Sequence, residues 1–272
     1  MDMTPMQNSR FLRLFFTFMV LTFSAACSGQ DQKSDLKKLL KTFYEEFVLI
    51  QPGQGNFGTT YKATHPTTKK EIEIKFSKPF YVAKYEVTQN LWREVMGSNP
   101  SRWKGERNSV EMMDFDEAVE FCQKVTKLLR EEKLISAKQL VRLPSEIEWE
   151  YVASAGTTTG YSFGNDASLL DDYAWYTGNA KGNDPPVGAK KPNPWGLYDI
   201  HGYLWEFTID SFGGERPVGQ LPADAWPPKK ANSILKSGSW KDPAVKLKTR
   251  YRLKIDKSVQ DDAVGLRCVL TR

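Results

Sequence analysis

The chain has 272 residues, of which 40% are hydrophobic and 26% charged, an ordinary globular composition. Its 38 Lys and Arg against 33 Asp and Glu give a formal charge of +5 with no dense basic stripe, so composition gives no support to nucleic-acid binding. High aromatic content (12%) with 19 Gly and 15 Pro excludes a coiled coil or a disordered chain, and only two His and three Cys restrict catalytic and metal-binding chemistry.

The N-terminal segment has the pattern of a secretory signal. Arg10 and Arg13 precede a short apolar run, residues 14–23, and then Ser-Ala-Ala before Cys27. The run is shorter than the roughly 20 apolar residues that span a bilayer, which predicts a signal peptide over residues 1–26. Its ending resembles a bacterial lipoprotein box, which implies a lipid anchor on Cys27; a plain signal peptide with an unmodified thiol is the alternative.

These features predict where the rest of the chain lies. We expect residues 27–33 to form a tether and residues 34–272 to form one domain, because no internal repeat or low-complexity linker divides them. The expected location is the bacterial cell envelope, lipid-anchored and facing the periplasm or the outer membrane. That compartment permits disulfide bonds.

The first half of the mature chain shows clear periodic patterns. Apolar residues at helical spacing predict an amphipathic helix over residues 34–48, and strict alternation predicts a strand over residues 71–76. Residues 80–87 are expected to form a second strand. Thr88 is then expected to cap a short helix that Gly97 closes.

Two capping boxes predict the main helices. Asp114 with Glu three residues later begins a helix that reaches about Glu132. Ser145 with Glu148 begins another, for which Gly156 is the expected end.

The last part of the chain has little periodicity. Residues 156–239 are rich in Gly, Pro, Asn, Asp and aromatics, and so long an irregular stretch requires something to hold it, such as a bound metal or a function. The apolar, β-branched residues 264–270 predict a closing strand.

A glycine-rich segment imitates a protein kinase. Residues 53–61 look like the loop that covers nucleotide phosphates, and Val82-Ala-Lys84 looks like the strand lysine. A kinase also needs a His-Arg-Asp loop and an Asp-Phe-Gly motif, and neither is present, since Asp116 follows Asp114-Phe115. We therefore interpret residues 53–61 as a hairpin turn that contains glycine.

Six phrases in order resemble the formylglycine-generating enzyme (sulfatase-modifying factor) family, and together they cover roughly residues 45–270. The resemblance implies an α+β, loop-rich fold related to C-type lectins, with few short helices and small antiparallel sheets. The phrases are residues 80–88, 99–105, 142–151, 192–207, 237–240 and 265–268.

The copper site of active family members is not expected in this chain. The resemblance implies two copper-binding cysteines a few residues after the Gly-Ser-Trp phrase, where thiolates select Cu(I). Here the first position has Asp242, and the second has Leu247 or Lys248. A related branch holds iron with three His, which His65 and His201 cannot supply. Both are interpreted as solvated or core residues.

The resemblance also implies a calcium site. Carried over by position, its ligands are the side chains of Asp199 and Glu206 and the carbonyls of Gly202 and Leu204, a mixture of oxygens that calcium prefers. The alternative is that Asp199 caps a turn and Glu206 forms an ion pair.

Two further features follow from the resemblance. Cys122 and Cys268 correspond to family cysteines that are bonded to each other, which implies a disulfide; two buried thiols are the alternative. Trp205, Ser239 and Trp240 correspond to positions that border the family's substrate cleft, so a groove is expected near them.

Together these observations favour a non-catalytic envelope lipoprotein that acts as a binding or scaffold module, with an envelope protein or a glycan as partner. An active oxidase that modifies a sulfatase cysteine and a calcium-dependent glycan-binding protein are the alternatives.

Overall fold

The computed structural model describes residues 33–65, 68–182, 184–212 and 232–272. The predicted signal peptide, Cys27 and nearly all of the tether lie outside these residues. The chain divides into two compact units, residues 1–39 and residues 40–272, and the second contains all the strands described below. Within the described residues, no helix combines the length and apolar character that crossing a membrane requires.

The first helix is shorter than the sequence predicts. It covers residues 33–45, and Phe47 already begins β1 (Phe47–Ile50) rather than ending the helix. The run Val48-Leu-Ile50 favours a strand, and β1 pairs with β4 (Phe80–Ala83). The predicted helix end at residue 48 is therefore wrong. Residues 47 and 48 belong to β1, because pairing with β4 overrides the helical spacing of the apolar residues there.

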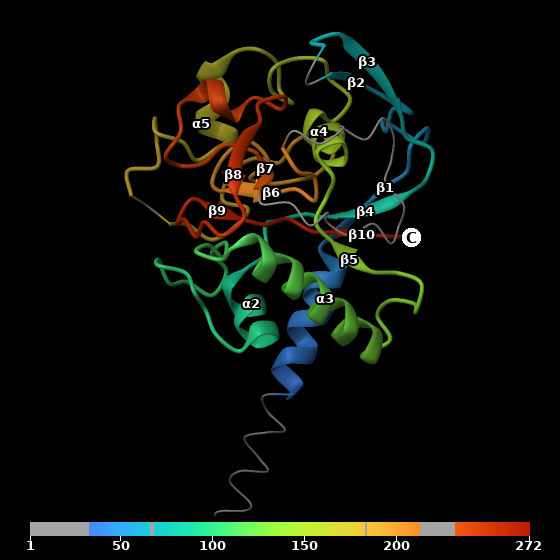
Figure 1. Ribbon diagram of the computed structural model, residues 1–272, viewed down its shortest axis with the longest axis vertical. Helices are drawn as coiled ribbons and strands as arrows, with labels where there is room; N and C mark the ends of the chain where they lie inside the picture. The colour runs from blue at the N-terminus through green and yellow to red at the C-terminus, as the bar shows by residue number, and fades with distance from the viewer. Residues whose placement is uncertain (1–32, 66–67, 183, 213–231) are drawn as a thin grey trace, which may run out of the picture. The chain divides into compact units, whose positions relative to one another are not determined.

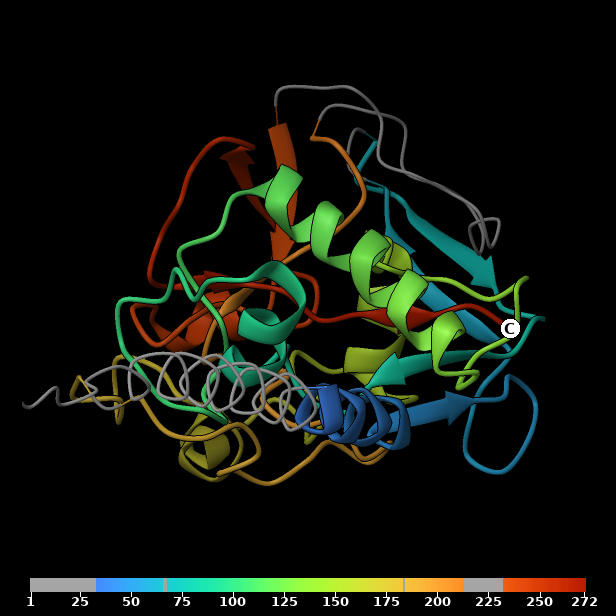
Figure 2. The ribbon, with the colours of Figure 1, turned by 90° about the horizontal axis from the view of Figure 1, so that it is seen from below.

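A four-stranded antiparallel sheet joins distant parts of the chain. Its order is β1-β4-β10-β5, where β10 is Val269–Leu270 and β5 is Val141–Arg142. On one side lie α2 (Gln89–Met96) and α3 (Phe115–Glu131), which pack against each other and, for α3, against β5 (Figure 1, Figure 2). Between the helices, the Trp92 and Phe121 rings stack at 5.2 Å.

The predicted strand at residues 71–76 is confirmed as β3 (Glu71–Lys75), and it forms a hairpin with β2 (Thr60–Thr64). The glycine-rich segment does form a turn before β2 begins at Thr60, closed by a hydrogen bond from the Gly53 amide to the Phe57 carbonyl. This turn is not a hairpin, because β1 and β2 belong to different sheets.

The second four-stranded sheet has the order β8-β7-β6-β9. It contains one parallel pair, β6 with β9, which the expectation of antiparallel sheets did not include. The predicted closing strand is also two strands, because residues 264–270 supply β9 to this sheet and β10 to the first one. The bounds are β6 Trp205–Phe207, β7 Asn232–Lys236, β8 Leu253–Asp256 and β9 Val264–Gly265.

Both predicted capping boxes are present. Asp114 and Glu117 close the start of α3, and Ser145 and Glu148 close the start of α4 (Glu146–Ser154). Gly97 ends α2 in the left-handed conformation, as predicted. Thr88 lies at the start of α2 without a side-chain bond to its backbone.

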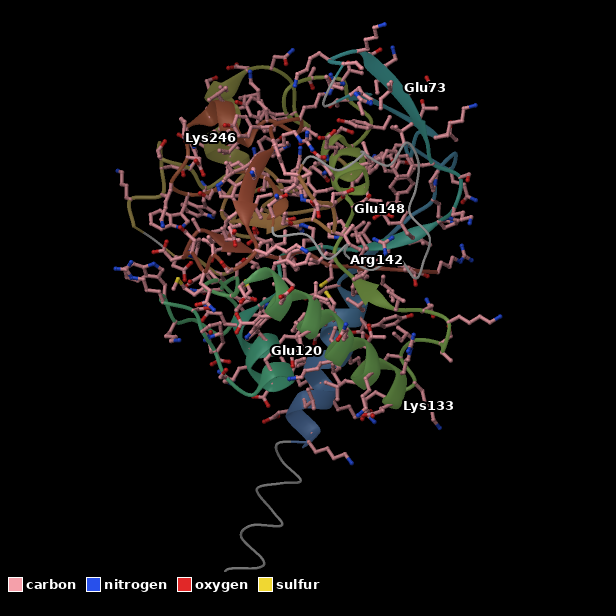
Figure 3. All side chains as sticks on the ribbon, viewed as in Figure 1. Glu73, Glu120, Lys133, Arg142, Glu148 and Lys246 are labelled. Carbon is pink, nitrogen blue, oxygen red and sulfur yellow. The ribbon has the colours of Figure 1, made fainter. Side chains whose placement is uncertain are left out.

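Helix α4 is buried along its whole length although it carries three glutamates. Each carboxylate has a cation beside it. Glu148 forms a two-point ion pair with Arg142 at 2.7 and 2.8 Å, and both side chains lie in the interior (Figure 3). Arg252 pairs with Glu146, and the buried Lys236 pairs with Glu150 at 2.7 Å. These pairs are necessary because a buried carboxylate without a partner strongly destabilises a fold.

Little regular structure occurs between residues 156 and 239, as the sequence predicts. The described part contains a short 3-10 turn, Ala167–Leu169, then α5 (Leu170–Tyr173), and the strands β6 and β7. A second 3-10 turn, Ala244–Leu247, follows β7.

Candidate functional site

The position of the first family cysteine is held by hydrogen bonds. The Asp242 carboxylate accepts from the Trp205 indole at 2.7 Å, from the Ser239 hydroxyl at 2.5 Å and from the Ser239 amide at 3.1 Å. Its other oxygen pairs with the Lys246 ammonium at 2.8 Å. Asp242 is buried, and its contacts connect the loop after β7 with strand β6.

The second position does not offer a metal ligand either. Leu247 is fully buried in an apolar cluster with Tyr161, Leu170 and Ala174, and the neighbouring Lys248 is exposed. A hard carboxylate whose oxygens are already engaged and an apolar side chain do not fit Cu(I), which prefers thiolates. The residues at this place therefore do not fit a copper ion.

One histidine lies in the core and the other is exposed, which agrees with the interpretation from the sequence. His201 is fully buried, where its Nδ1 bonds the Leu247 carbonyl at 3.0 Å and its Nε2 accepts from the Ser162 amide at 3.0 Å. Burial lowers the pKa of His201 to about 4, so the ring is neutral. His65 is exposed and accepts a hydrogen bond from the Thr68 amide at 3.1 Å.

The two residues expected to ligate calcium through their side chains have other partners. Both oxygens of Glu206 bond the guanidinium of Arg267, at 2.7 to 3.1 Å, and one also accepts from the Trp149 indole at 2.6 Å. This is the ion pair that the sequence left as the alternative. Asp199 accepts from the Gly188 amide at 2.7 Å, and its other oxygen has no hydrogen-bond partner.

Since Arg267 already neutralises Glu206, these residues as arranged do not fit a calcium ion. Across residues 33–272, outside the gaps named above, no group of three or more His, Cys, Asp or Glu has a metal-binding arrangement. Gly202 and Leu204 lie in the same segment, where the Gly202 amide donates to the Ser237 hydroxyl. Calcium binding by Asp199, Gly202, Leu204 and Glu206 stays a prediction.

Glu86 belongs to this buried group, although the sequence did not single it out. It accepts from the Leu204 amide at 3.2 Å and bonds the Ser109 hydroxyl. Burial raises the pKa of Glu86 well above its ordinary range, and the Glu206 and Asp199 carboxylates add to the shift. The available signal was its place in the phrase 80–88.

The two remaining cysteines lie together. The sulfurs of Cys122 in α3 and Cys268 are 3.9 Å apart, and both residues are buried as thiols in this structure. The disulfide between them stays a prediction.

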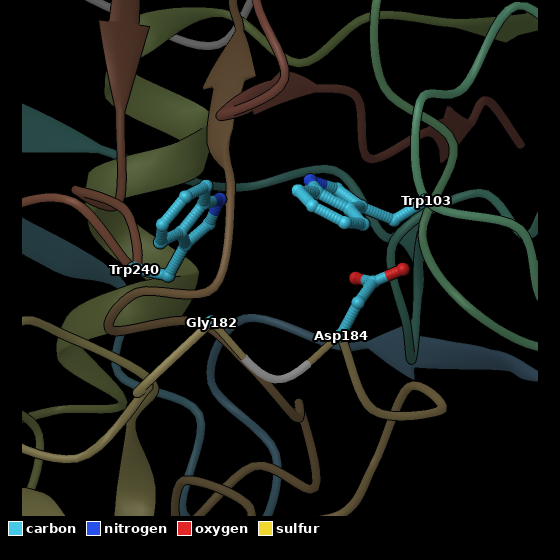
Figure 4. Close-up of a pocket in the computed structure, with 4 residues that line it drawn as sticks. All are labelled: Trp103, Gly182, Asp184 and Trp240. Atoms are coloured by element: carbon cyan, nitrogen blue, oxygen red, sulfur yellow. The ribbon is translucent and has the colours of Figure 1, made fainter.

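The expected groove is present at only one of its three predicted residues. Trp205 and Ser239 are buried and bond Asp242. Trp240 instead lines a small pocket, open to solvent, with Trp103, Gly182 and Asp184 (Figure 4).

Sequence reasoning missed three of the four pocket residues, namely Trp103, Gly182 and Asp184. Trp103 was part of the quoted phrase 99–105, and its place between Arg102 and Lys104 was a usable signal for an exposed position. Asp184 lies in the irregular segment, where nothing local marks it.

Comparison with known proteins agrees with this architecture. A family model described as sulfatase-modifying factor enzyme 1-like domain matches residues 32–272. Among solved structures, Treponema denticola variable protein 1 is similar, with a TM-score of 0.68 and 25% identity over 83% of this chain and 95% of that one. The predicted α+β, loop-rich fold is thereby confirmed.

Two relatives that are similar in sequence differ in their named function, since one is named a chaperone and the other an enzyme. Chaperone protein LppX of Paenibacillus barcinonensis is 28% identical over 273 residues, which cover 85% of this chain and 91% of that protein. The formylglycine-generating enzyme of Mycobacterium tuberculosis is 37% identical over 82 residues, only 26% of this chain and 27% of the enzyme.

Proposed function

We propose, from the premise that the chain belongs to the sulfatase-modifying factor enzyme 1-like family, that it is a non-catalytic member acting as a binding module. One observation carries this proposal. At the two positions where active relatives present copper-binding cysteines, this chain has an aspartate fixed by four hydrogen bonds and a leucine in the apolar core. Both side chains stabilise the loop after β7, so they serve the fold where relatives hold a redox metal.

Two further observations support a binding role in the cell envelope. The signal-like N-terminus with Cys27 is the pattern of an envelope lipoprotein anchored in a membrane. LppX, which matches most of this chain, is named a chaperone, and chaperones act by binding other proteins. A binding role for a protein or glycan of the envelope is consistent with both.

The test is a copper and aldehyde assay. The purified full-length chain in non-ionic detergent is incubated with Cu(I), oxygen and a peptide that carries a sulfatase cysteine motif. Copper content and peptide mass are then measured. We expect copper well below one ion per chain and no aldehyde, while a formylglycine-generating enzyme in the same assay converts the peptide.

A matched control variant removes the two cysteines that follow Cys27 in the sequence, Cys122 and Cys268. Cys122→Ser with Cys268→Ser shows whether copper found in the parent protein sits on this pair. Aldehyde formation by the parent chain would overturn the proposal and favour the oxidase alternative.

A further inference from the structure

The pocket beside Trp240 is walled by two tryptophans from distant parts of the chain. Trp103 follows α2, and Trp240 lies in the loop after β7. Figure 4 shows the two indoles on opposite sides of the hollow, with the Asp184 carboxylate directed toward Trp103 from a third side. Trp103 is 41% exposed, an unusual placement for the largest apolar side chain, and packing in the core does not account for it.

The carboxylate of the pocket has no cation of its own. Asp184 accepts hydrogen bonds from the Tyr203 hydroxyl at 2.8 Å and from the Asn108 amide at 2.7 Å, and both donors are neutral. Among the residues the structure describes, no Lys or Arg pairs with it. Burial raises the pKa of Asp184, and these two hydrogen bonds oppose the shift.

A second carboxylate lies behind the first wall of the pocket. Glu111 is only 1% exposed, and one of its oxygens accepts from the Trp103 amide at 3.0 Å while the other has no partner. Burial raises the pKa of Glu111 to about 7, and the carboxylates of Asp184 and Asp262 add to the shift. Glu111 is therefore partly protonated near neutral pH, and Asp184 is the main acidic group beside the indoles.

The nearby cations do not neutralise it. Arg102 lies over the Trp103 ring and Lys241 over the Trp240 ring, at 4.9 and 5.1 Å from the ring centroids. Arg102 pairs with Asp262 at 3.1 Å, and Lys241 pairs with Asp261 at 3.1 Å and with Asp262. Their charges therefore compensate Asp261 and Asp262, whereas Asp184 has no Lys or Arg partner among the described residues.

We propose that the pocket between Trp103 and Trp240, with Asp184 on its third side, binds an alkylammonium group. Aromatic faces attract cations through their negative π surfaces, and pairs of this kind contribute about 0.5–1 kcal/mol at exposed sites. A carboxylate that has no Lys or Arg partner, such as Asp184, adds direct charge attraction. Such a group is present in a lysine side chain of a peptide and in a choline headgroup. The proposal deepens the binding function proposed above and rests on it.

The test compares charged probes with neutral isosteres by titration calorimetry on the full-length chain in a detergent without choline. Choline is compared with dimethylbutanol, which has the same shape without charge, and Nα-acetyl-lysine methylamide is compared with its Nε-acetylated form. We expect each charged probe to bind at least about tenfold more tightly than its isostere. The stronger of the two charged probes identifies the source of the group.

Variants locate the binding. Asp184→Asn and Trp103→Ala should each weaken binding of the charged probe by about tenfold or more. Leu169→Ala, which truncates an equally exposed apolar side chain that does not line the pocket, should leave it unchanged. Circular dichroism of each variant checks that the fold is retained.

Three results would overturn the inference: equal binding of charged and neutral probes, no binding at millimolar concentrations, or binding that ignores Asp184→Asn. Retention of a neutral oligosaccharide that needs Trp103 but tolerates Asp184→Asn would indicate a glycan site instead. None of these outcomes affects the copper and aldehyde assay, so failure of this inference and failure of the proposed function are distinguishable.

Discussion

Two acidic regions of the molecule differ in how their charge is compensated. In the interior, Glu148 is matched by Arg142 and Glu206 by Arg267, each through two or more hydrogen bonds. At the pocket, Asp184 has only neutral donors. A buried carboxylate stays ionised only if a cation pairs with it, and otherwise its pKa rises, as it does for Glu86 and Glu111. A carboxylate at a pocket that meets solvent can stay ionised without a cation from its own chain. Glu148 and Glu206 therefore stabilise the fold through their ion pairs, whereas the carboxylate of Asp184 is available to a ligand.

The largest effect is expected where the interior pairing is broken. Arg267→Met leaves the Glu206 carboxylate buried with only the Trp149 indole as donor, and it also removes hydrogen bonds to three backbone carbonyls. We expect the free energy of unfolding to fall by about 3–5 kcal/mol, measured by urea denaturation. The matched control is Arg93→Met, which removes an exposed pair with Glu106 and should cost about 1 kcal/mol or less.

A second variant keeps this prediction testable if Arg267→Met does not fold. Adding Glu206→Gln removes the unpaired charge, so the double variant should recover part of the lost stability. Equal losses for Arg267→Met and Arg93→Met would mean that the interior pair contributes no more than a surface pair, and the contrast between the two regions would disappear.

Asp199 is an intermediate case, because it is buried and has no ion pair of its own, while the charge of Arg267 still favours its ionised form. Burial raises the pKa of Asp199 from 3.8 to about 6, with Glu206 adding to the shift while the Gly188 amide, Arg267 and Lys190 oppose it. Between these two pH values the folded chain binds more protons than the unfolded chain does. Stability contributed by this group is therefore complete below pH 4 and is lost as the pH rises through about 6.

The corresponding measurement is urea denaturation of the parent chain and of Asp199→Asn between pH 4.5 and 7.5. The parent should lose about 2 kcal/mol more than the variant over this rise in pH. Glu86 lies in the same group with its pKa raised in the same direction, so a residual slope is expected in the variant. Parallel curves for the two proteins would show that Asp199 is already ionised in the folded chain.

Local signals explain which parts of the fold were predictable. The capping boxes at Asp114 and Ser145 each lie within four residues, so they specify the starts of α3 and α4 without tertiary context. Strands such as β5 and β10 have two residues each and pair across more than a hundred residues, so they leave no periodic pattern. That is also why the closing segment was predicted as one strand and not two.

The same reasoning applies to the site. Resemblance pointed to Asp242 and Leu247 because they align with known positions, and to Trp240 because it borders a known cleft. It could not show that Trp103 and Asp184 approach Trp240, because the three residues lie in separate loops whose positions depend on the whole fold. The pairing of Glu206 with Arg267 was likewise invisible, although the sequence did leave an ion pair open for Glu206.

The smallest expected effect tests whether Trp103, which lines the pocket, contributes to the stability of the fold. Trp103→Ala truncates a half-exposed ring, and it keeps the backbone amide that bonds Glu111. We expect the free energy of unfolding, measured by urea denaturation, to fall by about 1 kcal/mol or less. By contrast, Trp149→Ala empties a fully buried position and removes a donor to Glu206, and it should cost about 3–5 kcal/mol. Comparable losses at the two tryptophans would mean that Trp103 is a structural residue, and its exposure would then no longer favour a ligand.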